Sequence, residues 1–382
     1  MNVAILLDRF PVTSQTFVVT QLLGLERAGH DVTVISRNRP LPEEPVHDEA
    51  RSVALVERAV YLNHALPVDS LEPVVGAALV PGAHDVLHAH FGTTARRFLF
   101  ARRQADAPMV VTFHGYDFSS QPLVHGSTMY DLLFEHVDAV TSNCQPARAA
   151  IEDLGCPPGK LRLVRVPVDV STFPFRPRRL EGLGRIRILS VGRLVEKKGH
   201  EVALRALAAA RSRLPPFTLD LVGDGPLAGR LASLVSELRL HDVVRLHGAQ
   251  DGTAVRQLLD EAHLFVLASR TATDGDREGT PVSLLEAQAV GLPVVSTQHS
   301  GIPEVVARGG GVLVPEADPV ALADALVRVV ERYESWPAMG AAGRAHVERV
   351  FDVDVCTKQL LEVYAEARDG FSLAGGGSPP TE

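Results

Sequence analysis

The sequence predicts an α/β protein made of two doubly wound, parallel-sheet domains in tandem. The chain has 382 residues, of which 46% are hydrophobic, so it can bury more than one core. Short apolar runs rich in β-branched residues alternate with segments of helical periodicity along most of the chain. Near-continuous apolar strands joined by helices are typical of parallel sheets that are covered on both faces.

Each half of the chain contains the same succession of predicted strands and helices. In the first half, the strands are expected at residues 2–7, 31–36, 85–91, 108–115, 138–143 and 161–168. The second half repeats this rhythm at residues 185–192, 217–225, 242–248, 263–269, 293–297 and 311–315. Two such domains predict a cleft, because ligands of open α/β sheets bind outside the carboxyl ends of the strands.

A proline- and arginine-rich segment, residues 166–185, fits an extended linker better than the interior of an element. A last amphipathic helix is expected to pack back on the first domain, and the glycine- and proline-rich tail has the composition of a disordered segment. The predicted divisions are domain 1 at residues 1–172, domain 2 at 173–354, the helix at 355–370 and the tail at 371–382.

Composition excludes several classes of protein. The net charge of -8 provides no basic surface for nucleic acid. The 3 cysteines form no CxxC pair, which is typical of reduced thiols in the cytoplasm. The N-terminus lacks the basic region of a signal peptide, and no apolar run reaches the roughly 20 residues that span a bilayer. We therefore expect a cytoplasmic protein, with the inner face of the membrane as a further possible location.

The stretch REGTPVSLLEAQAVGLPVVST, residues 277–297, follows a predicted strand and a polar loop. Thr280 is the expected N-cap of its helix, with Pro281 at the first helical position and Gly291 as the stop. A helix N-terminus at the carboxyl end of a parallel strand is an anion-binding site, and phosphate is the expected ligand. Glu278 and Glu286 would then reach different parts of one elongated ligand, since carboxylates accept hydrogen bonds from sugar hydroxyls.

An ordinary structural role is the alternative for these two glutamates, one in a solvated loop and one at an exposed helix position. A second feature favours a binding site. Arg193 and Lys198 directly follow another predicted strand, where two cations can neutralise a diphosphate.

The segments GRLVEKKG (192–199), EGTPVSLLEAQAVGLPVVST (278–297) and GIPEVV (301–306) together resemble family 4 of the retaining glycosyltransferases. The resemblance covers nearly the whole second domain. It implies the GT-B fold, in which two Rossmann-like domains face each other across a cleft. It also implies transfer of a hexose-type sugar to an acceptor hydroxyl with retention at the anomeric carbon. The donor is expected to be a nucleotide sugar, for which UDP is the family's commonest nucleotide and GDP is an open alternative. Neither a metal nor another cofactor is expected.

The resemblance assigns roles to individual residues. The family's two glutamates, separated by seven intervening residues, match Glu278 and Glu286, and the resemblance implies that the first contacts the donor sugar and the second the ribose. Arg193 and Lys198 match the cations that hold the diphosphate. Main-chain groups complete the implied donor site at Gly225, Ala249, Gly279, Thr280, Pro281 and Val282. For Gly225, in the turn at 221–230, tight strand-to-helix packing is an equally good explanation.

The first domain resembles a bacterial subgroup of the family that includes enzymes of exopolysaccharide and colanic-acid assembly. The loop after the first strand places Ser14, Gln15 and Thr16 at the cleft, where they would contact phosphate or acceptor or simply cap the next helix. Gln15 replaces the usual glutamate of this motif. His114 matches a histidine that lines the donor-sugar site. A zinc site formed by His88, His90 and His114 is a disfavoured alternative.

The segment TTARRFLFARRQ, residues 93–104, mixes arginines with aromatic residues and suits either an anionic membrane and lipid-linked acceptor or ordinary helix packing. Both a growing polysaccharide on a lipid carrier and a small natural-product aglycone are compatible acceptors. Two rival functions remain. A nucleotide-sugar 2-epimerase of the same fold would need acid/base carboxylates and no acceptor, and a non-catalytic sugar-nucleotide-binding subunit would not need the intact motif.

Overall fold

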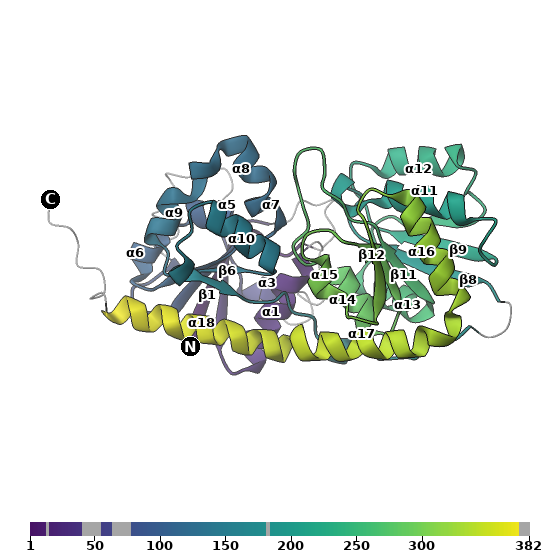
Figure 1. The fold of residues 1–382 in the computed structure, drawn as a ribbon. Coiled ribbons are helices and arrows are strands. Elements are labelled where there is room, and N and C mark those ends of the chain that lie inside the picture. The colour runs from purple at the N-terminus through teal and green to yellow at the C-terminus, as the bar shows by residue number, and fades with distance from the viewer. Residues whose placement is uncertain (13–14, 40–54, 63–77, 181–183, 374–382) are drawn as a thin grey trace. The chain divides into compact units, whose positions relative to one another are not determined.

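The computed structural model describes residues 1–12, 15–39, 55–62, 78–180 and 184–373, and the chain forms two compact units (Figure 1). Unit 1 consists of residues 1–167 and 353–382, and unit 2 of residues 168–352. The divisions therefore fall at Val168 and Val353 rather than at residues 173 and 355. The Val168 N–H donates to the Phe351 carbonyl at 2.9 Å, and Val168 forms a parallel bridge with Asp352, which fastens the start of the linker to unit 2.

Unit 1 is built on a seven-stranded sheet in the order β3-β2-β1-β4-β5-β6-β7, with every pair parallel. Val3, Ile5 and Leu7 face one core, whereas Ala4 and Leu6 face the other, so both faces of the sheet are covered. All six predicted strands are confirmed. The seventh strand, β3, was not predicted because two residues are too few to form a recognisable sequence pattern. The strands are β1 (Asn2–Arg9), β2 (Asp31–Asn38), β3 (Val60–Tyr61), β4 (Val86–His90), β5 (Met109–Thr112), β6 (Ala139–Ser142) and β7 (Leu161–Leu163).

The helices of unit 1 include the C-terminal α18, Val353–Leu373, which packs on the same core as β1 through Leu360, Val363 and Tyr364. A Cβ at Gly24 of α1 would lie 2.4 Å from Thr357 Oγ1, so glycine permits the close approach of α1 and α18. The other helices are α1 (Thr16–Arg27), α3 (Leu55–Arg58), α5 (Gly92–Arg97), α6 (Ala101–Ala105), α7 (Gly115–Phe118), α8 (Ser120–His125), η3 (Ser127–Tyr130), α9 (Asp131–His136), α10 (Gln145–Asp153) and η4 (Pro158–Lys160).

The helix predicted at residues 355–370 is longer at both ends than expected. It continues through residues 371–373, which the sequence assigned to a disordered tail, because the glycine- and proline-rich run begins only at residue 375. The rest of that predicted tail, residues 374–382, lies outside the described residues.

Unit 2 repeats the architecture with a six-stranded parallel sheet in the order β10-β9-β8-β11-β12-β13, and all six predicted strands are confirmed. Leu264 and Val266 of β11 face one core, and Phe265 and Leu267 face the other. The strands are β8 (Ile186–Val191), β9 (Phe217–Val222), β10 (Val244–Leu246), β11 (Leu264–Leu267), β12 (Val294–Thr297) and β13 (Gly311–Val314). The helices are η5 (Val170–Thr172), η6 (Glu196–Lys198), α11 (His200–Ala210), α12 (Ala228–Glu237), α13 (Gly252–Glu261), α14 (Val282–Ala289), α15 (Ile302–Val305), α16 (Pro319–Glu331), η7 (Tyr333–Ser335) and α17 (Trp336–Val350).

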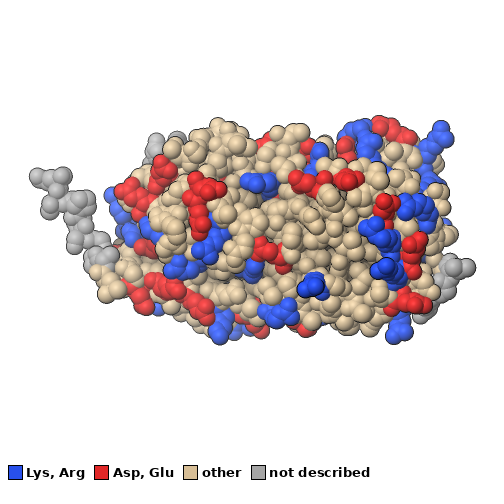
Figure 2. All heavy atoms as spheres, in the orientation of Figure 1, with Lys and Arg blue, Asp and Glu red and all other residues tan. Residues whose placement is uncertain are grey.

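Each unit therefore has its own parallel α/β sheet, as predicted. Within the described residues, no helix is both long and apolar enough to cross a membrane. Basic and acidic side chains are interspersed over the face shown in Figure 2.

Candidate active site

Unit 2 gathers its charged site residues at the carboxyl ends of β8 and β11. Arg193 follows β8, and η6 then carries Lys198. Gly199, which ends η6, has a φ of +65°, and a Cβ there would lie only 1.7 Å from the Ala268 carbonyl oxygen. Only glycine lets this turn lie against the end of β11. The turn thereby brings Lys198 to Glu278, in the loop between β11 and α14.

Lys198 and Glu278 form a buried ion pair. The Nζ and Oε1 atoms are 2.8 Å apart, and the two side chains are only 14% and 7% exposed. Burial raises the pKa of Glu278, but the charges of Lys198 and Lys197 outweigh burial and lower this pKa to about 2. Burial lowers the pKa of Lys198, and the Glu278 carboxylate opposes this shift. Glu278 is therefore an ionised carboxylate at neutral pH.

The backbone of Glu278 is held by residues that follow the two neighbouring strands. Its N–H donates to His299 Nε2 at 3.1 Å, and Ser300 Oγ donates to its carbonyl oxygen at 2.6 Å. His299 Nδ1 bonds to the carboxylate of Glu316, which also accepts from the Thr271 N–H at 3.0 Å. Because Nε2 accepts, the ring hydrogen lies on Nδ1 and His299 is neutral. Burial lowers the pKa of His299 and favours this neutral form.

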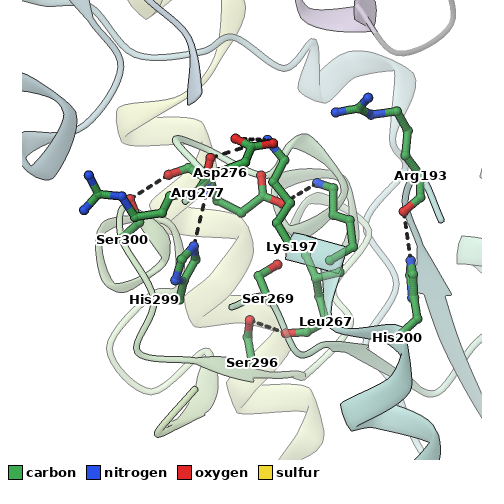
Figure 3. A network of polar contacts seen from close by, with 12 residues as sticks. Arg193, Lys197, His200, Leu267, Ser269, Asp276, Arg277, Ser296, His299 and Ser300 are labelled. Atoms are coloured by element: carbon green, nitrogen blue, oxygen red, sulfur yellow. Dashed lines mark hydrogen bonds and ion pairs between the residues drawn. The ribbon is translucent and has the colours of Figure 1, made fainter. Parts of the chain in front are cut away.

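The loop of residues 270–277 is fastened to the turn that carries Lys198. The Lys197 Nζ lies 2.9 Å from Asp276 Oδ2. The carboxylate of Glu196 accepts from Thr273 N–H at 3.0 Å and from its hydroxyl at 2.7 Å, and it also pairs with Arg270. Figure 3 shows Lys197, Asp276 and His299 around one small volume at this edge of the sheet. The two segments that supply Lys198 and Glu278 are thus joined into one framework.

Arg193 lies beside this framework with an exposed side chain. Its guanidinium points away from His200 in Figure 3, whereas its carbonyl oxygen lies 3.2 Å from His200 Nε2. Burial and the charge of Lys198 lower the pKa of His200 to about 4, so its neutral ring donates Nε2–H to that carbonyl. Arg193 also contributes to the lowered pKa of Lys198, which shows that the two cations are electrostatically close.

Helix α14 begins at the Glu278 loop. The predicted N-cap at Thr280 is wrong by one residue: Pro281 is the N-cap, with ψ +109° and no side-chain cap hydrogen bond. Its extended backbone delays the first helical residue to Val282. The predicted stop at Gly291 is confirmed, since Gly291 has a φ of +87° and the Leu292 N–H donates to the Ala287 carbonyl at 2.9 Å. Gly279 is buried before the helix, and Glu286 is partly buried within it.

The corresponding edge of unit 1 carries three buried histidines, two on β4 and one directly after β5. His90 Nδ1 lies 3.2 Å from His114 Nε2, and the two rings stack at a centroid distance of 5.5 Å. His88 Nδ1 lies 2.7 Å from the Tyr364 hydroxyl on α18. The Gln21 Nε2 bridges the series, at 3.3 Å from His88 Nδ1 and 3.4 Å from His90 Nε2. A continuous polar chain therefore runs from His114 to the C-terminal helix.

Burial keeps this histidine chain neutral. It lowers the pKa of His90 to about 3 and the pKa values of His88 and His114 well below the usual range, with mutual repulsion adding to the shift for His88 and His114. A neutral imidazole donates through one nitrogen and accepts through the other, so the orientation of each ring fixes that of the next. The His114 N–H also donates to Asp117 Oδ2 at 2.9 Å.

Comparison with known proteins identifies the family. Residues 174–346 match the family of glycosyl transferases group 1, and residues 14–172 match glycosyltransferase family 4. WcaL of Salmonella typhimurium, a glycosyltransferase assigned to colanic acid biosynthesis, is 32% identical over 95% of this chain and 99% of its own length. The chain belongs to family 4 of the glycosyltransferases.

Other relatives of this glycosyltransferase agree with the assignment. The amylovoran biosynthesis glycosyltransferase AmsK of Erwinia amylovora is 31% identical over 93% of this chain and 97% of its own length. The structure of HepE from Anabaena with UDP and glucose has a TM-score of 0.76 at 19% identity and covers 96% of this chain and 99% of that one. The structural likeness supports the predicted GT-B fold.

Close packing accounts for two of the three glycines of the turn at 221–230 in this glycosyltransferase. A Cβ at Gly223 would lie 2.0 Å from the Gly192 carbonyl oxygen, and one at Gly225 would lie 2.7 Å from that of Leu194. Both glycines also have positive φ, of +141° and +154°. Ala249 is exposed in the loop after β10, next to Gly248, whose carbonyl accepts from the Gly223 N–H at 2.9 Å.

The predicted phosphate or acceptor loop of the glycosyltransferase is partly described. Ser14 lies outside the described residues, Gln15 occupies the N-cap position of α1, and Thr16 is its first residue. The adjoining Phe17 ring lies 4.7 Å from that of His114, centroid to centroid. Unit 1 thus joins this loop to His114, just as unit 2 joins Arg193, Lys198 and Glu278.

Sequence reasoning missed the residues that support these side chains, namely the Lys197–Asp276 pair, His299 and Glu316. One sequence signal could have indicated them: His299 follows β12 and Glu316 follows β13, so both lie at the same edge of the sheet as Glu278. For the disfavoured alternative of a zinc site at His88, His90 and His114, the part of the chain that the structure describes contains no group of three or more His, Cys, Asp or Glu residues that could hold a metal ion.

Proposed function

We propose that this glycosyltransferase moves a hexose-type sugar, with retention, from a nucleoside-diphosphate sugar to an acceptor hydroxyl during the assembly of a polysaccharide or lipid-linked glycan. The observation that carries the proposal is the buried Lys198–Glu278 pair, where a turn after β8 meets the start of α14. The relatives assigned to colanic acid and amylovoran biosynthesis support a polysaccharide pathway, since each is matched over almost its whole length.

In this proposal, the diphosphate of the donor binds to Arg193, Lys198 and the free amides at the start of α14. Lys198 then exchanges the carboxylate of Glu278 for a phosphate oxygen, which releases Glu278 to accept hydrogen bonds from the donor sugar. Glu286 binds the ribose, and Ala249 and Gly225 lie beside the nucleotide. The fixed framework around Glu278 reduces the reorganisation needed at the moment of reaction.

The proposed reaction proceeds on one face of the sugar. The bond between the anomeric carbon and the diphosphate oxygen breaks, and the acceptor oxygen bonds to the same face of that carbon. The acceptor proton passes to the departing phosphate oxygen, whose negative charge Arg193 and Lys198 stabilise. Catalysis then comes mainly from positioning and electrostatic stabilisation, without a base from the protein.

UDP is the first nucleotide to test and GDP the second. HepE was solved with UDP, whereas a relative from Mycolicibacterium smegmatis, 30% identical over 82% of this chain, is named as a GDP-mannose-dependent mannosyltransferase. Calorimetric titration with UDP, GDP and ADP, with and without magnesium, tests the proposal. We expect metal-independent micromolar binding of one nucleotide that is lost in Lys198→Ala and kept in Lys358→Ala, since Lys358 is an exposed residue of α18. Absence of binding by all three nucleotides would refute the donor site.

A further inference from the structure

A surface pocket lies on unit 1, outside the site described above. It has a volume of about 540 Å³ and is lined by residues of α5, α8, η3 and α9. Arg96 and Arg97 of α5 line one part of it, and Met129, Leu132 and Leu133 supply apolar surface. The pocket therefore combines cationic and apolar surface, which a purely hydrophilic sugar would not require.

The charge at the pocket is positive. Its lining residues include two arginines and no carboxylate. Arg96 is exposed and has no ion-pair partner among the residues that the structure describes. Arg97 contacts Asp8 at 3.0 Å, but Arg37 also lies 3.6 Å from the same carboxylate oxygen, so one negative charge serves two cations. An anionic group such as phosphate is the complementary ligand.

The rim of the pocket exposes hydrocarbon. Leu132 of α9, which lines the pocket, is 61% exposed. Leu123 and Val124 belong to α8, the helix that supplies Gln121 and His125 to the pocket, and are 72% and 69% exposed. Three large apolar side chains are therefore exposed within ten residues of the chain, and exposed apolar surface of this kind is common at binding sites.

The pocket is linked to the candidate acceptor side of unit 1. Thr93, which also lines it, donates its N–H to Asp117 Oδ1 at 3.4 Å, and the other oxygen of Asp117 accepts from the His114 N–H at 2.9 Å. A single carboxylate therefore connects the pocket wall to the start of the His114 helix.

From these observations we propose that the pocket binds the phosphate or diphosphate of a lipid-linked acceptor, with Arg96 and Arg97 on the phosphate and the exposed apolar rim on the first part of the hydrocarbon chain. The inference rests on the proposed glycosyl transfer and specifies its acceptor as a phosphate ester of a long-chain lipid. A small natural-product aglycone offers no phosphate for these arginines.

Calorimetry with farnesyl diphosphate, in the presence of saturating nucleotide to occupy the donor site, tests the pocket. We expect binding that Arg96→Gln weakens about tenfold, in line with the loss of a charge-assisted hydrogen bond, and that Leu132→Ser also weakens. The matched controls are Arg103→Gln, at an exposed arginine of α6, and Val320→Ser, at an exposed valine of α16. Both controls should bind like the wild type.

Inorganic diphosphate, farnesol and vesicles of phosphatidylcholine with phosphatidylglycerol complete the experiment. If each of these three probes binds more weakly than farnesyl diphosphate, the result supports the proposal, because the pocket then requires the phosphate and the hydrocarbon chain in one molecule. Binding to the anionic vesicles without binding to farnesyl diphosphate would overturn it in favour of a bilayer surface, and equal binding by Arg96→Gln and wild type would also overturn it. Because nucleotide binding is measured on the same samples, failure of the donor site is distinguished from failure of the pocket.

Discussion

In unit 2 the buried pair Lys198 and Glu278 is charged, whereas the three buried histidines of unit 1 are neutral. Lys198 and Glu278 face each other as ions at 2.8 Å. His88, His90 and His114 are all held below their usual pKa by burial and are joined by hydrogen bonds. Fixed charges suit exchange with an ionic ligand such as a diphosphate. Oriented neutral donors and acceptors suit hydroxyl groups, which carry no charge to compensate.

The two arrangements also differ in what they contribute to stability. Burying two ions costs desolvation that their attraction only partly offsets, so a buried ion pair is weak evidence of stabilisation. A fully bonded neutral chain carries a smaller desolvation cost and specifies one arrangement of its members. The ion pair of unit 2 is therefore better explained by ligand binding than by a contribution to folding stability. The histidine chain of unit 1 can contribute to both stability and ligand binding.

Removing one ion of the pair has the largest expected effect. Lys198→Ala leaves the buried carboxylate of Glu278 without its main partner, which should lower the free energy of unfolding by about 3 kcal/mol. It also removes the cation expected at the diphosphate, so kcat should fall by about 100-fold or more. Chemical unfolding and steady-state kinetics measure both effects. Lys358→Ala, at an exposed lysine, should change neither, and a Lys198→Ala enzyme of normal kcat would contradict the comparison.

Removing both ions should separate stability from function. Lys198→Met combined with Glu278→Gln replaces a buried ion pair by uncharged groups of similar size, and such replacements are often neutral or stabilising. We expect the double variant to recover most of the stability lost in Lys198→Ala while nucleotide binding remains absent. Thermal unfolding and calorimetric titration of the same preparations provide the test. Recovered binding would show that the charges are not needed for the ligand.

The sequence predicted the sheets better than the contacts at their edges. The twelve strands at the predicted positions are confirmed because each contains a short, largely apolar run, as expected for parallel strands that are buried on both faces of the sheet. The Lys198–Glu278 pair joins residues 80 positions apart, and its formation depends on how Gly199 lets a turn approach β11. Pattern reasoning finds each partner but not the contact. The cap at Pro281 was missed for a similar reason, since one residue's ψ decides it.

His90→Gln tests the neutral chain of unit 1. The variant leaves His114 and Gln21 with poorly matched buried partners, which should cost about 1–3 kcal/mol of stability. Nucleotide binding should stay within about twofold of wild type, because the proposed donor contacts of unit 2 retain their charges. Urea unfolding and nucleotide titration are the measurements, and His136→Gln at an exposed helix position is the matched control. A large loss of nucleotide affinity would contradict the division of roles between the units.

The pH dependence of stability sharpens the comparison further. The pKa of His90 is about 3 in the folded protein and near 6.5 when unfolded, so the unfolded state takes up a proton between these values and stability falls as pH falls. The destabilisation caused by His90→Gln should therefore shrink by about 2 kcal/mol between pH 7.5 and pH 5.0, at roughly 1.4 kcal/mol per pH unit below 6.5.

Glu278→Gln is the matched comparison for that experiment. Its carboxylate has a folded pKa of about 2 and an unfolded value of 4.5, so its contribution to stability is present above 4.5 and is lost only as pH falls towards 2. The destabilisation by Glu278→Gln should thus be nearly the same at pH 7.5 and pH 5.0. Urea unfolding of both variants at the two pH values checks this. Parallel pH responses would mean that the two sites do not differ in charge as described.

The smallest expected effect is at the far end of the histidine chain. Tyr364→Phe keeps the ring packed in the core of unit 1 but removes the hydroxyl that lies 2.7 Å from His88 Nδ1. Gln21 Nε2 remains 3.3 Å from the same nitrogen, so His88 keeps one partner and the loss should be about 1 kcal/mol. Urea unfolding measures this loss, and the double variant Tyr364→Phe with Gln21→Leu removes both partners. A cost for the double variant that exceeds the sum of the single costs would show that the two groups act as one network, whereas strict additivity would show that His88 holds α18 independently of the chain that leads to His114.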